Sequence, residues 1–156
     1  MEEPIPLSVP CSHITSEPAM FSRIDRVMIC VPDLARGIEQ YGRMGYNICP
    51  GGMHTGKGTH NAIAFNQDDY IELLAIRDQA EYEAAAGVPG NPDAGLADFI
   101  AAGGGIRYIV LQSDDLAAEV AAMRSRGVDV SDAIEGGRRT PAGQALHWRG
   151  AVLGPK

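Results

Sequence analysis

The chain has 156 residues, of which 45% are apolar and 21% charged, and its formal net charge is −7 at pH 7. This composition is typical of a soluble globular protein and excludes a fibre or a wholly disordered chain. No apolar run approaches the roughly 18–20 residues that a membrane-spanning helix needs. Arg138 and Arg139 form the single pair of adjacent basic residues, and this acidic balance argues against nucleic-acid binding. We therefore expect neither a nucleic-acid nor a membrane partner.

The cysteines and the first residues indicate the compartment. Cys11, Cys30 and Cys49 form an odd set without a Cys-x-x-Cys pair, so neither a disulfide framework nor a zinc knuckle is predicted. This pattern fits the reducing cytoplasm. Residues 1–22 hold four prolines and lack the apolar stretch of a secretory signal, so we expect a flexible N-terminal tail.

The hydrophobic pattern predicts a first module over about residues 23–77. Within it a helix is expected over 33–44, and strands are expected over 24–31, 46–49, 61–66 and 70–76. Residues 78–105, rich in Ala, Gly and Pro, are expected to form a linker. It should hold one short helix that begins near Asn91 and ends at three consecutive glycines.

A second module is expected over about residues 106–156. It should contain a helix over 115–126 and strands over 106–112, 128–130 and 145–152. The glycine that follows each predicted long helix is suited to the left-handed residue with which many helices end.

The two modules also repeat in sequence. Asp-Leu-Ala at 33–35 returns at 115–117, 82 positions later, and each Asp is suited to cap a helix. Gly-Gly-x-x-Thr-x-x-Gly at 51–58 returns at 136–143, 85 positions later, where we expect a glycine turn between strands. With this second offset the counterpart of Glu72 falls one position past Lys156, so the second module is expected to lack its last strand. We predict an α+β fold of tandem βαβββ modules, the second one incomplete.

Four short segments, in the context of this repeat, carry a resemblance to a known family. They are Ile-Asp-Arg-Val at 24–27, Val-Pro-Asp-Leu at 31–34, Gly-Thr-His-Asn at 58–61 and Tyr-Ile-Glu-Leu-Leu at 70–74. In this order they resemble the vicinal oxygen chelate superfamily, and most of all its glyoxalase-like domain branch. The resemblance implies a cup-shaped sheet around a divalent metal ion, and a homodimer. It does not fix the reaction, since glyoxalase I, extradiol dioxygenases, epimerases and drug-resistance proteins share this scaffold.

The resemblance also implies where metal ligands would lie, on the first and fourth strands of each module. The corresponding positions here hold Arg26, Glu72 and Tyr108, and the fourth position lies beyond the chain. Because arginine cannot act as an ordinary ligand, a site for zinc, nickel, manganese or iron is expected to be incomplete. Glu72 and His60 remain as candidate metal ligands.

Arg26 and Glu72 are also catalytic candidates, because the family's strand order would place them opposite each other inside the cup. In one interpretation Arg26 takes the electrostatic role of the metal and binds a carboxylate or enolate oxygen, while Glu72 orients it or acts as a base. In the other, the two form an ion pair that only stabilises the cup wall.

Three histidines differ in their expected roles. His60 shares a strand face with Ala62 and Ala64, whose small side chains would leave room for a ligand, so it is the third catalytic candidate. Its alternative is a hydrogen-bonded histidine at the start of a strand. His54 is expected to face solvent from a glycine turn. His147 corresponds to Ala62 in the repeat and is a candidate for substrate binding.

The remaining substrate-binding candidates are apolar. Tyr108 and Trp148 could form an aromatic wall, and Met28 lies on the same strand face as Arg26. The alternative is that they fill the core. Cys30 is expected to be a buried apolar residue rather than a nucleophile. No nucleotide is expected, because the Gly-x-x-x-x-Gly-Lys sequence at 51–57 is followed by glycine where a phosphate-binding loop needs Ser or Thr.

Three functions stay open at this point. The first is an enzyme that binds a small oxygenated or carbonyl metabolite between the modules, a lyase or isomerase acting through an enediolate-type intermediate, with a dioxygenase less favoured. The second is a non-catalytic sequestering protein like those of bleomycin resistance, for which the net charge of −7 would suit a cationic drug. The third is a degenerate, inactive paralogue.

Overall fold

A computed structural model describes residues 21–88 and 91–154. The expected N-terminal tail, apart from residues 21 and 22, lies outside this part of the chain. The described residues form seven strands: β1 (Ile24–Cys30), β2 (Ile48–His54), β3 (Thr59–Asn66), β4 (Asp69–Ile76), β5 (Gly105–Leu111), β6 (Ile134–Arg139) and β7 (Ala145–Gly150). The helices are α1 (Leu34–Arg43), α2 (Gln79–Ala86), α3 (Leu96–Ala101) and α4 (Leu116–Ser125). None of these helices is long and apolar enough to cross a membrane.

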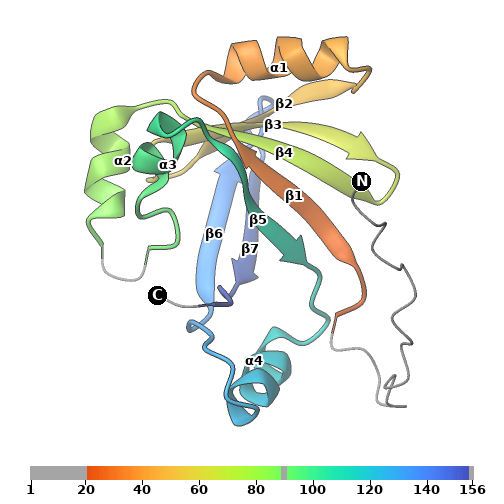
Figure 1. The fold of residues 1–156 in the computed structure, drawn as a ribbon, viewed down its shortest axis with the longest axis vertical. Coiled ribbons are helices and arrows are strands. Elements are labelled where there is room, and N and C mark those ends of the chain that lie inside the picture. Colours follow the sequence, from red (N-terminus) through yellow and green to blue (C-terminus); the bar gives the residue numbers. More distant parts are fainter. Residues whose placement is uncertain (1–20, 89–90, 155–156) are drawn as a thin grey trace, which may run out of the picture.

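The strands form one curled sheet in the order β5-β1-β4-β3-β2-β6-β7 (Figure 1). β1 and β4 run parallel, and every other neighbouring pair is antiparallel. The sheet curls so far that β6 and β7 lie behind β5 in Figure 1, although β5 and β7 are its two outer strands. This architecture confirms the predicted α+β fold of glyoxalase-like βαβββ modules.

The two long helices begin where the repeat predicts. Asp33 accepts a hydrogen bond from the backbone N–H of Arg36 at 2.9 Å, and Asp115 accepts one from Ala118 at 3.0 Å. Each carboxylate satisfies a backbone donor that the first helical turn leaves without a partner. The repeated Asp therefore has the same structural role in both modules.

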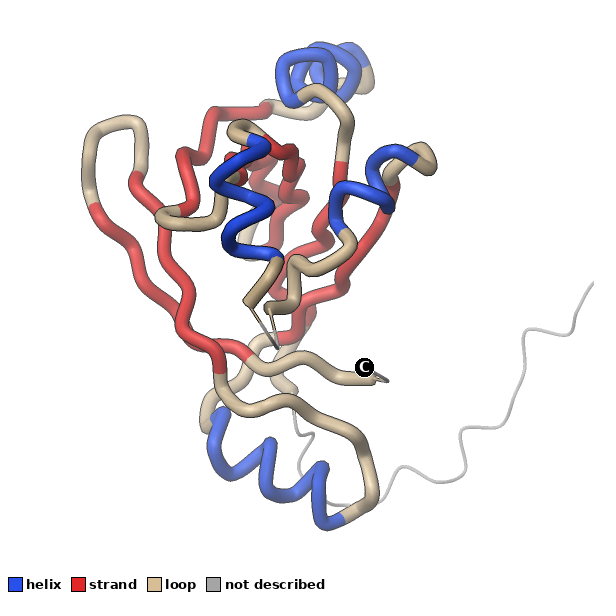
Figure 2. Tube along the Cα trace, turned by 90° about the vertical axis from the view of Figure 1, so that its left-hand side faces the viewer, coloured by secondary structure: helices blue, strands red, loops and turns tan. Residues whose placement is uncertain are grey.

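The two faces of the sheet have different neighbours (Figure 2). On one face α1 packs over β3 and β4, where Leu34 contacts a buried layer that includes Ala62 and Leu73. On the other face, at one end only, α2 and α3 pack through Tyr82 and Leu96. The curl of the sheet encloses the rest of that second face, and α4 reaches its cavity through Leu116 and Met123.

Three elements differ from the sequence prediction. The glycine pairs of the repeat do not form turns but lie inside β2 and β6, and the turns follow at residues 55–58 and 141–144. The linker contains α2 in addition to the expected short helix. The strand expected over 128–130 is reduced to a single bridge between Val130 and Leu153.

The first glycine pair lies inside a strand because two backbones meet there. Gly52 has φ +136°, and a Cβ at this position would lie 1.8 Å from the carbonyl oxygen of Arg139 in β6. Only glycine allows both this dihedral angle and this approach. The pair therefore joins the two modules instead of reversing the chain.

Candidate functional site

The curled sheet encloses a cavity of about 970 Å³. Both modules line it, the first through β1, β2, β3 and β4 and the second through β5, β6, β7 and α4. A cavity of this size accommodates a small organic molecule, and its lining combines apolar side chains with a compact group of charged residues.

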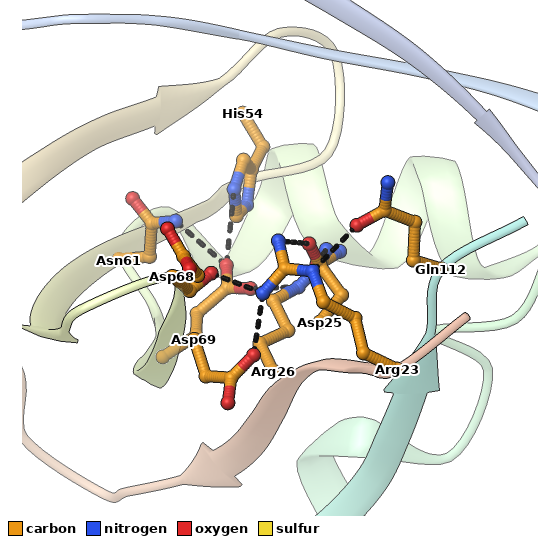
Figure 3. A network of polar contacts seen from close by, with 9 residues as sticks. Arg23, Asp25, Arg26, His54, Asn61, Asp68, Asp69 and Gln112 are labelled. Carbon is orange, nitrogen blue, oxygen red and sulfur yellow. Dashed lines mark hydrogen bonds and ion pairs between the residues drawn. The ribbon is translucent and has the colours of Figure 1, made fainter.

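Glu72 lies at the centre of that charged group and is only 4% exposed. Its Oε1 accepts a hydrogen bond from Asn61 Nδ2 at 2.6 Å, and its Oε2 lies 2.8 Å from Arg26 Nε (Figure 3). The predicted proximity of Arg26 and Glu72 is thus confirmed. Because the Nε–H of Arg26 is not aimed at the oxygen, the contact is an ion pair without a hydrogen bond.

Arg26 is held from three sides. Its Nη1 donates to Asp25 Oδ2 at 2.6 Å, and its guanidinium lies 5.6 Å from the centre of the Tyr70 ring. Burial alone would lower the pKa of Arg26, but the attraction of Glu72, with smaller contributions from Tyr70 and Asp25, outweighs burial and raises it. Arg26 therefore carries a fixed positive charge beside the carboxylate.

A further charged residue, Arg23, lies just before β1 and closer to the protein surface than Arg26. Arg23 donates to Gln112 Oε1 at 2.8 Å and forms an ion pair with Asp69 at 2.5 Å, so it links β1 to the end of β5 and the start of β4 (Figure 3). These contacts fix the strand that carries Arg26.

His54 is buried beside Glu72, whereas the sequence predicted that it faces solvent. It is the last residue of β2, because the strand continues through the glycine pair, and it is 7% exposed. Its Nδ1 lies 2.8 Å from Thr59 Oγ1 and its Nε2 lies 3.8 Å from Glu72 Oε1. Burial lowers the pKa of His54 below 6.5, although Glu72 opposes this shift. His54 is therefore neutral at pH 7.

His60 does not lie in the cavity, contrary to the sequence prediction. It does share a face with Ala62 and Ala64, but this face packs beneath α1. The alanines are small because the helix approaches closely there, not because a ligand needs the space. Burial, together with Arg77, lowers the pKa of His60.

Asn61, which the sequence analysis did not select, lies on the cavity face instead. It is 3% exposed, and its Oδ1 has no hydrogen-bond partner within the described residues. A Cβ at position 51 would lie 2.2 Å from this oxygen, so Gly51 makes room for the amide. The sequence does hold a signal for Asn61. In β3 it shares a face with Thr59 and Ile63, and this face is opposite to the one that carries the small alanines.

The substrate-binding candidates contribute to the cavity in different ways. Met28, Tyr108 and Trp148 line it, and the Tyr108 hydroxyl donates to the carbonyl of Pro92 at 2.6 Å. His147 also belongs to the lining, but its side chain is exposed. Trp148 lies edge-on to His54, with 6.2 Å between the ring centres. Cys30 is buried, and burial raises the pKa of its thiol to about 11, as expected for a core residue.

The residues at this site do not fit the divalent metal that the family resemblance implies. Within residues 21–88 and 91–154, no three His, Cys, Asp or Glu side chains are grouped closely enough to hold an ion. Oε1 of Glu72 accepts a hydrogen bond from Asn61, Oε2 is ion-paired with Arg26, and this positive charge lies where the resemblance implies a metal ligand. His60, the second candidate ligand, lies on the other face of the sheet.

The family follows from a match that spans most of the chain. Residues 24–156 match the model of the glyoxalase-like domain. The chain belongs to the glyoxalase-like domain family. No curated protein matches its sequence significantly.

Solved structures share the fold of this glyoxalase-like domain. A hypothetical protein from Staphylococcus aureus is 21% identical with a TM-score of 0.72, covering 85% of this chain and 53% of its own length. This chain thus spans about half of that protein. Methylmalonyl-CoA epimerase from Mycobacterium tuberculosis is 21% identical with a TM-score of 0.58, over 93% of this chain and 95% of its own. A variant of the Streptomyces coelicolor methylmalonyl-CoA epimerase, in complex with 2-nitronate-propionyl-CoA, is 22% identical with a TM-score of 0.55, over 83% and 85%.

Proposed function

We propose that this glyoxalase-like protein binds a small carbonyl-containing metabolite in its cavity and removes a proton from the carbon beside the carbonyl group. The reaction would be that of a lyase or isomerase with an enediolate-type intermediate. The observation that carries the proposal is a buried His54 in the wall of the cavity, whose Nε2 lies 3.8 Å from the Glu72 carboxylate.

His54 has the properties of a general base. If its Nδ1–H donates to Thr59 Oγ1, which lies 2.8 Å away, the lone pair of Nε2 is free to accept a proton. Its lowered pKa keeps that lone pair available at pH 7. Once His54 is protonated, the negative charge of Glu72 stabilises the imidazolium. We therefore assign the base to His54 and the supporting charge to Glu72.

Arg26 supplies the complementary charge. Removal of a proton next to a carbonyl group moves negative charge onto the carbonyl oxygen, and a fixed cation in a site shielded from water stabilises that charge. The guanidinium of Arg26, held by Asp25 and Tyr70, is preorganised for this task.

The structural neighbours support this reaction class. Two of them are named as methylmalonyl-CoA epimerases, and an epimerase inverts the configuration of a carbon atom. A CoA ester with an acidic C–H bond is therefore among the substrates that we propose to test, beside 2-oxo acids, 2-hydroxy acids and hemithioacetals.

Proton transfer can be tested by NMR in D₂O. Each candidate is incubated with the protein, and the loss of its C–H signal is followed. We expect at least one compound to exchange, and we expect His54→Gln to slow the exchange by about 100-fold or more, as is typical for a lost general base. His60→Gln is the matched control, because His60 lies on the opposite face. Exchange that persists unchanged in His54→Gln would contradict the assignment.

A non-catalytic binding protein is the alternative, and one observation favours it. Both oxygens of Glu72 already have a partner, Asn61 through a hydrogen bond and Arg26 through an ion pair, so this carboxylate does not need a ligand to compensate its charge. In that case a ligand would bind against Trp148 and Tyr108, and no compound would exchange. Binding without exchange would support this alternative, and absence of both would support an inactive paralogue.

A further inference from the structure

One cation in the cavity wall differs from the others. Four lysine and arginine side chains line the cavity, and three of them form ion pairs with carboxylates: Arg26 with Glu72, Lys57 with Asp93, and Arg149 with Glu135. The fourth, Arg138, has no carboxylate partner within the described part of the chain. Its Nη1 donates to the backbone carbonyl of Gly51. A guanidinium carries five N–H donors, so most of its hydrogen-bonding capacity remains unused.

Arg138 lies directly beside the proposed base. In the pairing of β2 with β6, Arg138 stands opposite His54. Residues paired in this way have Cα atoms about 4.5–5.5 Å apart and side chains on the same face of the sheet. The charge of Arg138 also reaches the imidazole. Burial is the main reason why the pKa of His54 is lowered, and Arg138 adds a small part of the shift.

The cavity lining holds a second donor beside Arg138, the indole N–H of Trp148. Gly136 lies two residues earlier on the same face of β6, and a Cβ there would lie 2.3 Å from the indole nitrogen of Trp148. The missing side chain lets the indole lie against the backbone of β6. The indole N–H makes no hydrogen bond to residues 21–88 or 91–154, and Trp148 and Arg138 both line the cavity.

We propose that Arg138 binds an anionic group of the ligand, a carboxylate or a phosphate, with the Trp148 indole N–H as a second donor. This proposal rests on the proposed function and narrows it: the substrate is a carbonyl compound with an anionic group. Binding that group next to His54 places the neighbouring C–H bond at the base. The local charge around Arg138, not the net charge of −7, determines which ligand the cavity accepts.

The alternative role of Arg138 is structural. β2 and β6 pair over only two positions, and the hydrogen bond from Arg138 to Gly51 adds a link between them. A structural role would not depend on the charge of a ligand. The test therefore has to compare charged with neutral probes.

The single tryptophan provides the readout, since its fluorescence reports on the cavity alone. Wild-type protein is titrated with oxalate, inorganic phosphate and the neutral analogue oxamide. We expect binding of at least one anion and weaker binding of oxamide. Arg138→Gln should weaken anion binding by tenfold or more, because hydrogen bonds from a charged group are strong. Arg138→Lys should keep part of the affinity, and it remains informative if the glutamine variant does not fold.

Arg139→Gln is the matched control. Arg139 is the next residue of β6, points to the other face and donates to the carbonyl of Gly143 at 3.3 Å. We expect anion affinity within twofold of wild type. A preference for oxalate would identify a carboxylate, and a preference for phosphate would identify a phosphate group. If neither anion binds the wild type, or if Arg138→Gln binds both as well as wild type does, the proposal is overturned.

The deuterium-exchange assay separates this inference from the proposed function. If Arg138→Gln loses anion binding while no compound exchanges its proton, the anion site stands and the catalytic function fails. If a substrate exchanges at the same rate in Arg138→Gln as in wild type, the function stands and the anion site fails.

Discussion

Glu72 is a buried carboxylate with two partners, an ion pair with Arg26 and a hydrogen bond from Asn61. We predict that Glu72→Gln lowers the free energy of unfolding by about 2–3 kcal/mol, because it removes one of the two carboxylates that pair with the buried charge of Arg26. Chemical denaturation measures this change. Glu39→Gln is the control, since the pair of Glu39 with Arg43 is exposed, and it should change stability by less than about 0.5 kcal/mol. Equal effects of the two substitutions would contradict this account.

His54 makes stability depend on pH in a defined direction. Its pKa in the folded chain lies below 6.5, so below pH 6.5 the unfolded chain takes up a proton that the folded chain does not. The free energy of unfolding should therefore fall as pH decreases from 6.5, by at most about 1.4 kcal/mol per pH unit for this residue, and it should level off below the folded-state pKa. Denaturation between pH 7.5 and 4.5 measures the slope.

The control for this pH dependence is a comparison of two variants. His54→Gln should flatten the slope below pH 6.5, while His60→Gln should keep the contribution of His54. The pKa of His60 is also lowered by burial, so His60→Gln removes the contribution of His60 to the pH dependence of the free energy of unfolding. An unchanged slope in His54→Gln would show that the imidazole is not held neutral by burial.

For single residues, the sequence predicts a place in the site only where strand alternation and strand order together determine which side chains meet. They are sufficient for Arg26 and Glu72, whose proximity follows from the family's strand order. They fail for His60 and His54. Alternation says which residues of β3 share a face, but not which face the helix covers, and the glycine pair conceals that β2 continues to His54.

Among the elements, β1 with β5 and β2 with β6 join the two modules, and at Gly52 the backbones of β2 and β6 approach closely. We predict that Gly52→Ala destabilises the protein by at least about 2 kcal/mol more than Gly143→Ala does. Both glycines have positive φ, +136° and +85°, but a Cβ at Gly52 would meet the backbone of Arg139 at 1.8 Å, whereas nothing lies within 4 Å at Gly143. Thermal unfolding measures the difference. Similar losses in both variants would show that the contact between the strands relaxes easily.

The elements themselves were predictable to different degrees. α1 and α4 carry capping Asp residues and apolar periodicity, and both form where the sequence predicts. α2 was not predicted, because its alanine-rich sequence has no distinct apolar face and only Tyr82 is fully buried. β6 was not predicted because glycine is rare in strands, and tertiary contact rather than propensity places Gly136 and Gly137 there.

For the whole molecule, the outer strands make a prediction about assembly. β5 and β7 each have one edge without a partner strand among the described residues, and Ile106 on β5 is 63% exposed. Such edges favour pairing with another chain. We therefore expect a homodimer, with about twice the 16.5 kDa mass of one chain in sedimentation equilibrium.

Two variants test that assembly. Ile106→Glu should dissociate the dimer, because it places a charge on the open strand. Met44→Glu replaces an equally exposed apolar side chain at the end of α1 and should leave the dimer intact. A wild-type chain that sediments as a monomer at all concentrations would contradict the expectation.

We propose that His54 is a neutral base whose Nε2 is free to accept a proton. NMR of protein labelled with ¹⁵N-histidine, titrated from pH 8 to 4.5, tests this proposal, with His54→Gln identifying the signal of His54 among the four histidines. We predict that Nδ1 carries the proton at pH 7, that Nε2 is unprotonated, and that the pKa lies below 6.5. A proton on Nε2, or a charged imidazole at pH 7, would contradict the account.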